Sequence, residues 1–75
     1  MRNFYVVNTR IGPFYIAESG KLFHVIYDDR SLGSYARPEQ AAEDVARGHT
    51  FSIPGVDTAT LGIPEDLGEW RRLPS

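Results

Sequence analysis

The sequence feature that most constrains the fold is a single helix signal that follows a series of strand-like segments. Residues 37–48 carry Pro38 at the first helical position, Glu39 in the first turn and Gly48 at the C-terminal end. This order is typical of helix start and stop signals. The segment therefore predicts one main helix, whose narrow apolar stripe needs a sheet to pack against.

Four short segments rich in β-branched and aromatic residues precede this helix, at residues 4–9, 14–18, 21–27 and 32–35. Turn-forming residues separate them, and each connection is too short for a crossover, so neighbouring strands must run antiparallel. The sequence predicts an α+β fold: a three- to four-stranded antiparallel meander, one main helix packed on it and a C-terminal tail of short helical turns. We expect a single domain over 1–75, with the meander at 1–36, the helix at 37–48 and the tail at 49–75 folded back on the sheet.

Both faces of the third strand are apolar. Alternation places Leu22, His24 and Ile26 on one face, and Phe23, Val25 and Tyr27 on the other. A single helix covers only one face, so the second face needs the C-terminal segment, a second copy of the chain or a ligand. We favour the C-terminal segment, because it carries four large apolar side chains: Phe51, Ile53, Leu67 and Trp70.

Composition limits the function classes. The net charge is −2, whereas binding to nucleic-acid phosphates favours a basic surface. The chain has no cysteine, and no apolar run reaches the roughly 20 residues of a membrane span. The N-terminal residues lack the pattern of a secretory signal peptide. We expect a cytoplasmic protein that does not bind a membrane.

The sequence predicts neither catalysis nor a cofactor. The two histidines, His24 and His49, lie far apart in the chain without cysteine neighbours, which is a poor pattern for a metal site. No Gly-x-Ser-x-Gly nucleophile motif and no phosphate-binding glycine loop occurs. We expect no enzyme activity, no metal and no cofactor.

Four residues are candidates for contact with a partner protein or a nucleic acid. Three are arginines at predicted turns or at the helix start, and the fourth follows the helix C-terminus: Arg10, Arg30, Arg37 and His49. A histidine at a helix C-terminus has either a capping role or a role in ligand contact.

Two family resemblances exist. The segments Gly20–Tyr27, Leu32–Tyr35 and Glu39–Ala42 resemble the plant ethylene-response type of DNA-binding domain, which implies a three-stranded sheet with a helix. In that family one sheet face lies in the DNA major groove. The matching face here cannot read base edges, so the resemblance carries the fold and none of the DNA contacts; that face is formed by Phe23, Val25 and Tyr27.

The second resemblance covers most of the chain from about residue 20. The segments Pro38–Val45, Gly48–Phe51 and Leu61–Trp70 are similar to a family of short uncharacterised bacterial proteins, which implies a bacterial origin and no assigned activity. The functional hypothesis is a small non-catalytic interaction or regulatory module that acts through a protein partner or by forming a homodimer. The alternative is a nucleic-acid-binding module on a scaffold like the ethylene-response domain.

Overall fold

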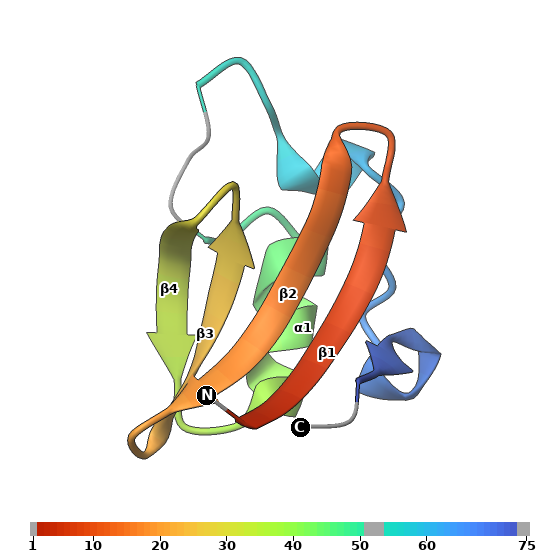
Figure 1. The fold of residues 1–75 in the computed structure, drawn as a ribbon. Helices are drawn as coiled ribbons and strands as arrows, with labels where there is room; N and C mark the ends of the chain where they lie inside the picture. Colours follow the sequence, from red (N-terminus) through yellow and green to blue (C-terminus); the bar gives the residue numbers. More distant parts are fainter. Residues whose placement is uncertain (1, 51–53, 74–75) are drawn as a thin grey trace.

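The computed structural model describes residues 2–50 and 54–73, which form one sheet with a helix and short turns on one side (Figure 1). The elements in chain order are β1 (Arg2–Thr9), β2 (Gly12–Ser19), β3 (Leu22–Tyr27), β4 (Arg30–Tyr35), helix α1 (Pro38–Ala46), the 3-10 turns η1 (Thr58–Thr60) and η2 (Leu67–Glu69), and β5 (Arg71–Arg72).

The predicted antiparallel meander is confirmed. The sheet has five strands in the order β4-β3-β2-β1-β5, and every pair is antiparallel. The fifth strand was not predicted: residues 71 and 72 of the tail pair with Val6 and Tyr5 at the free edge of β1. A strand of two residues lacks the length that alternation needs to be visible in a sequence.

Three of the four predicted strands, β1, β2 and β4, are longer than the sequence segments indicated, whereas β3 begins one residue later, at Leu22. β2 begins at Gly12 and includes Pro13, which pairs with Asn8 of β1, although a glycine followed by a proline is typical of a break. Proline is tolerated near the first residue of a strand, because its missing N–H is not needed there. The Asp28–Asp29 turn has only two residues between strands, so β4 begins at Arg30.

The helix signals behave as predicted. Pro38 begins α1, Arg37 is an N-cap whose side chain makes no capping hydrogen bond, and Gly48 has a φ of +76° after the helix end. A Cβ atom at Gly48 would lie 2.8 Å from Oδ1 of Asp57. Glycine is therefore required at this position by backbone conformation and by space.

The core lies between one sheet face, which we call the inner face, and α1. The sheet contributes Phe14, Ile16, Val25 and Leu32, the helix contributes Ala41, Ala42 and Val45, and the tail contributes Ile63 and Trp70. Two inner-face rings, Phe14 and Tyr27, stack with centroids 4.6 Å apart. The small helical alanines allow a close approach of α1 to the strands.

The prediction that the tail covers the second sheet face is wrong for Leu67 and Trp70, which pack into the same core as α1. Phe51 and Ile53 lie outside the described residues. A helix of nine residues is only about 13 Å long, and α1 lies mainly over β3 and β4. The tail therefore completes the same layer, and the Trp70 indole N–H donates to the Pro64 carbonyl at 2.9 Å.

The face that the ethylene-response resemblance aligns with the DNA-binding surface is also the inner face here. Phe23 and Tyr27 pack against the core, and Val25 is fully buried in it. Helix α1 therefore covers this face, and the face that remains is the opposite one.

Candidate functional site

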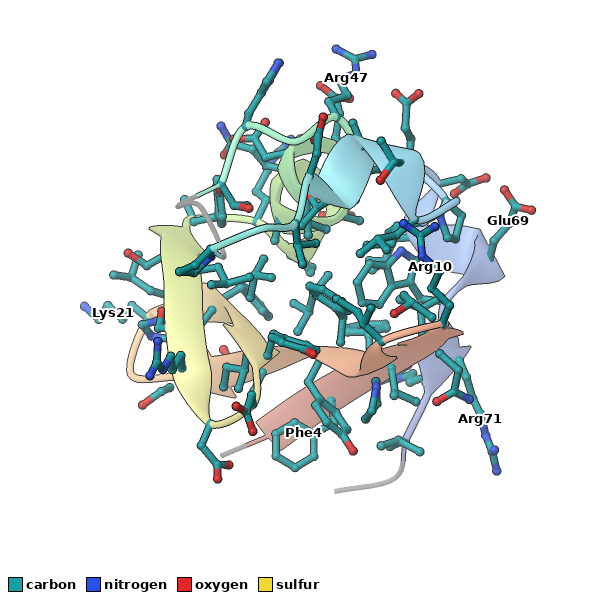
Figure 2. All side chains as sticks on the ribbon, turned by 90° about the horizontal axis from the view of Figure 1, so that it is seen from above. Phe4, Arg10, Lys21, Arg47, Glu69 and Arg71 are labelled. Carbon is teal, nitrogen blue, oxygen red and sulfur yellow. The ribbon has the colours of Figure 1, made fainter. Side chains whose placement is uncertain are left out.

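The candidate site is the sheet face opposite α1, which we call the outer face. Alternation along three strands places apolar and aromatic side chains on it: Phe4 and Val6 from β1, Tyr15 and Ala17 from β2, and His24 and Ile26 from β3. Figure 2 shows Phe4 projecting from the side of the sheet that lies away from α1. The Phe4 and Tyr15 rings lie 6.4 Å apart at a tilt of 57°.

Strand register aligns the central residues of this face into one row. Tyr15 pairs with Val6 on one side and with Ile26 on the other. The row continues to Arg71 of β5 at one edge and to Ser31 of β4 at the other. Because paired residues in antiparallel strands point to the same face, the row has an apolar centre with polar side chains at both ends.

The outer face is open within the described part of the chain. Helix α1 and both 3-10 turns lie on the other side of the sheet (Figures 1 and 2). Val6, Tyr15 and Ile26 are half-buried, and Ala17 on the same face is fully buried. Leu22, at the other end of β3, is 42% exposed. Contiguous apolar surface that the described chain leaves uncovered is typical of interaction sites.

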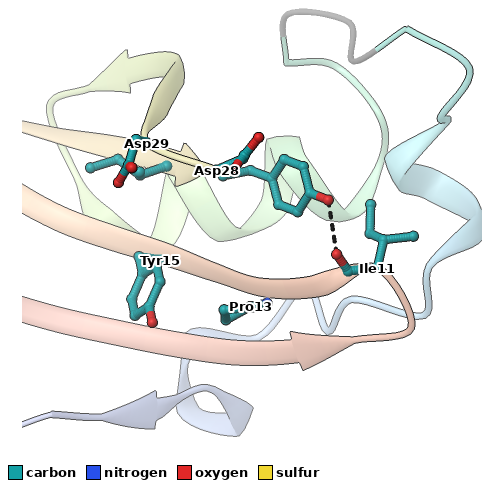
Figure 3. Close-up of a pocket in the computed structure, with 7 residues that line it drawn as sticks. Ile11, Pro13, Tyr15, Asp28 and Asp29 are labelled. Carbon is teal, nitrogen blue, oxygen red and sulfur yellow. Dashed lines mark hydrogen bonds between the residues drawn. The ribbon is translucent and has the colours of Figure 1, made fainter.

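An acidic cleft lies at one end of the outer face, between the β1–β2 and β3–β4 turns (Figure 3). Its volume is about 250 Å³, and its lining residues are Ile11, Pro13, Tyr15, Ile26, Tyr27, Asp28 and Asp29. The Tyr27 hydroxyl donates to the Ile11 carbonyl at 2.8 Å and ties the two turns together. The cleft thus combines an apolar floor with two exposed carboxylates.

The two carboxylates occupy a tight two-residue turn between β3 and β4. Asp28 and Asp29 have φ values of +51° and +62°, the left-handed conformation that both central residues of a type I′ hairpin turn require. Asn and Gly are the residues that such turns favour. The turn therefore carries two negative charges at positions where glycine would adopt the left-handed conformation with less strain.

Basic residues lie at the opposite edge of the same face. Arg71 and Arg72 of β5 are both exposed. Arg71 pairs with Val6 and so belongs to the outer face, whereas Arg72 pairs with Tyr5 of the inner face. Figure 2 shows Arg71 projecting on the same side of the sheet as Phe4. The outer face is therefore basic at the β5 edge and acidic near the β3–β4 turn.

The structure does not bring the predicted contact residues together. Arg30 begins β4, and Arg37 lies beyond the other end of that strand. Arg10 is in the β1–β2 turn, where its guanidinium donates to the Thr60 carbonyl at 3.1 Å. His49 follows α1, and its backbone N–H donates to the Asp44 carbonyl at 2.8 Å. These four residues do not form one patch.

His49 lines a second cleft of about 320 Å³, together with Thr50 and the β4 residues Leu32, Gly33, Ser34 and Tyr35. Burial, together with the charge and the hydrogen bond of the Asp44 carboxylate, raises the pKa of Tyr35 from its ordinary 10.0 to about 12. The phenol therefore stays protonated at neutral pH, and it serves as a hydrogen-bond donor rather than as a nucleophile.

The described residues contain neither a cluster of metal-binding side chains nor a membrane-spanning helix. Between residues 2 and 50 and between 54 and 73, no group of three or more His, Cys, Asp or Glu side chains is placed to hold a metal ion. Within these same ranges, no helix is long and apolar enough to cross a membrane.

The charged ends of the outer face were not predicted from the sequence. The Arg71–Arg72 pair is typical of a solvated pair near a C-terminus, and Asp28–Asp29 is typical of an ordinary turn. Only the strand order places both on the rim of one surface. The sequence did contain a signal for the apolar centre of the outer face, because Val6 in β1 and Tyr15 in β2 alternate with residues that point to the opposite face.

Comparisons with protein-family models, with curated proteins and with solved structures find no match for this chain. The resemblances to a family of short bacterial proteins and to the ethylene-response domain therefore stay predictions.

Proposed function

We propose that this domain is a small, non-catalytic protein-interaction module whose binding surface is the outer face of the sheet. The observation that carries the proposal is the row Val6–Tyr15–Ile26, which forms an apolar centre between Arg71 and Ser31. Helix α1 and the 3-10 turns of the tail lie on the other side of the sheet (Figure 2). Interfaces typically combine such an apolar centre, often with an aromatic residue, and a polar rim.

The charges of this surface favour a protein over a nucleic acid. Asp28 and Asp29 line the cleft beside Tyr15, so a phosphate backbone that stacked a base on this ring would approach two carboxylates. Three of the candidate cations lie apart from one another rather than around the rings: Arg10 in the β1–β2 turn, Arg30 at the start of β4 and Arg37 before α1. The Phe4–Tyr15 pair could stack bases, and nucleic-acid binding is therefore the outcome that would replace this proposal.

The test compares three proteins immobilised for capture from the native cell extract. The binding variant is Val6→Thr/Ile26→Thr, in which threonine keeps a β-branched shape but adds a hydroxyl group. The matched control is Arg30→Gln/Arg37→Gln, which changes two exposed residues that do not point to the outer face: Arg30 pairs with Tyr27 of the inner face, and Arg37 precedes α1. We expect a protein that the wild type and the control retain and that the binding variant loses, with melting temperatures confirming that all three are folded.

Two results would overturn the proposal. One is a set of captured proteins that is the same for the binding variant and the wild type. The other is binding of mixed DNA or RNA at low salt that weakens as salt rises and that the Arg30→Gln/Arg37→Gln variant lacks.

A further inference from the structure

We propose that the outer face docks on the outer face of a second copy of this chain, around a two-fold axis that runs parallel to the strands above β2. This inference rests on the proposed function and names its partner. It follows from the strand order, from the distribution of charge along the rim and from the size of the face.

The strand order makes the outer face self-complementary. β2 is the central strand of the order β4-β3-β2-β1-β5. A two-fold axis above β2 places β1 of one copy over β3 of the other, and β5 over β4. Val6 then faces Ile26 of the second copy, and the two Tyr15 side chains meet at the axis. Sheets that pack face to face in this aligned way are common, and an interface around a two-fold axis uses the same patch on both copies.

The same axis brings opposite charges together twice. Arg71 lies in the Val6–Tyr15–Ile26 row at the β5 edge. The Asp28–Asp29 turn follows Ile26 by two residues, roughly 7 Å along the strand, at the side where β3 meets β4. In the docked pair, Arg71 of each copy faces Ser31 of the other, and an extended arginine side chain spans the roughly 7 Å from there to the Asp28–Asp29 turn.

The size of the face predicts a weak dimer. Strands spaced about 4.8 Å apart, with a rise of about 3.3 Å per residue, give this sheet an outer surface of roughly 500 Å² per copy. Two copies would bury on the order of 1,000 Å², which is below the usual range of stable interfaces. We therefore expect a dimer that forms in the high micromolar range and that is driven partly by charge, so that added salt weakens it.

The first experiment is sedimentation equilibrium of the full chain from about 10 μM to about 1 mM. We expect the average mass to rise from that of one copy toward that of two. The variant Tyr15→Lys places two like charges at the axis, and we expect it to remain monomeric over this range. The variant Arg37→Glu changes an exposed residue away from the outer face, and it should dimerise like the wild type.

The second experiment exchanges the charges. Arg71→Glu and Asp28→Lys/Asp29→Lys should each weaken self-association about tenfold or more, because each places like charges together twice. Mixed in equal amounts, the two variants should form a heterodimer with an affinity near that of the wild type. In that heterodimer the introduced glutamate faces the introduced lysines, and the unchanged Arg71 faces the unchanged aspartates.

A second charge variant provides the test if the lysine variant does not fold. If the lysines do not fold at these positive φ values, Asp28→Asn/Asp29→Asn keeps residues that tolerate the left-handed conformation. It removes both carboxylates, so it should still weaken the dimer.

Three outcomes would overturn this inference: a wild type that stays monomeric at about 1 mM, self-association that none of these variants changes, or folded charge variants that do not recover affinity when mixed. A monomeric wild type whose Val6→Thr/Ile26→Thr variant still loses a captured protein would refute the homodimer and leave the proposed function standing. A monomeric wild type with no such loss would refute both.

Discussion

The two faces of the sheet carry similar side chains in different surroundings. On the inner face, Phe14 and Val25 are completely buried beneath α1 and the tail. On the outer face, their strand neighbours Tyr15 and Ile26 are half-buried, and α1 and the 3-10 turns lie on the other side of the sheet (Figures 1 and 2). Apolar side chains allow a strand face to be buried. Whether the face is buried within one chain depends on whether another element of that chain packs on it.

On the inner side of the sheet, polar side-chain atoms form hydrogen bonds to backbone carbonyl groups of other segments of the chain. The Trp70 indole N–H donates to the Pro64 carbonyl, and the Tyr27 hydroxyl donates to the Ile11 carbonyl. No buried side-chain nitrogen or oxygen among the described residues lacks a hydrogen-bond partner. The inner face is therefore the structural half of the sheet, and stability should depend on it far more than on the outer face.

The largest test of this comparison is a pair of truncations at neighbouring positions of β2. We expect Phe14→Ala to lower the free energy of unfolding by about 4 kcal/mol, because it leaves a cavity in a fully buried site. Tyr15→Ala on the outer face should cost about 1 kcal/mol, because its ring is only half-buried. Urea unfolding at low protein concentration measures both values. Equal costs would contradict the distinction between the faces.

The contribution of the tail is tested by Trp70→Ala. Trp70 is 4% exposed, and we expect its truncation to cost about 3 kcal/mol, because the indole fills the part of the core that α1 does not reach. The control Trp70→Phe keeps an aromatic ring and removes the N–H donor to Pro64, so it should cost roughly 1 kcal/mol. An unchanged melting temperature for Trp70→Ala would show that the tail is not part of the core.

Substitutions in the acidic turn should be able to raise the free energy of unfolding, whereas the truncations in the core lower it. Asp28→Asn/Asp29→Gly introduces the residues that a type I′ turn favours and should raise the free energy of unfolding by about 1 kcal/mol. The same variant removes two carboxylates from the outer face. Thermal unfolding would therefore report a gain in stability while sedimentation reports weaker self-association. A loss of stability would contradict the positive φ values at this turn.

The smallest expected effect is a pH dependence at the inner face. The pKa of Tyr35 is raised from 10.0 to about 12 in the folded protein, so the folded state holds the phenolic proton more tightly than the unfolded state. This contribution to stability is fully present below the ordinary pKa, and it is lost as the pH rises through the folded-state pKa. The free energy of unfolding across this alkaline range should fall less steeply for Tyr35→Phe than for the wild type. An identical slope would exclude a shifted pKa.

Local patterns predicted most of the fold and little of the candidate site. The alternation of Phe23, Val25 and Tyr27 with Leu22, His24 and Ile26 is confirmed, because the strand period depends only on neighbouring residues. Asp57 caps the short turn η1, and its side chain accepts from the Ala59 N–H at 3.0 Å, as is typical of aspartate at a helix start. Such features are local, and a sequence carries them directly.

The site depends on residues that are distant in the sequence. Arg71 reaches the outer face only because β5, near the end of the chain, pairs with β1 at its beginning. The candidates Arg10, Arg30, Arg37 and His49 are each predicted from a turn or a helix end, and the topology separates them. Proximity between distant segments has no local signature in a single sequence.

By itself, the sequence determined the hairpins, the position of the helix and the presence of two apolar sheet faces. The tertiary structure alone decided which face α1 covers, where Trp70 packs and which charges border the outer face. The physical reason is that alternation is symmetric between the two sides of a strand. When both sides are apolar, the choice between them depends on how the helix and the tail pack together, and this is a property of the whole chain.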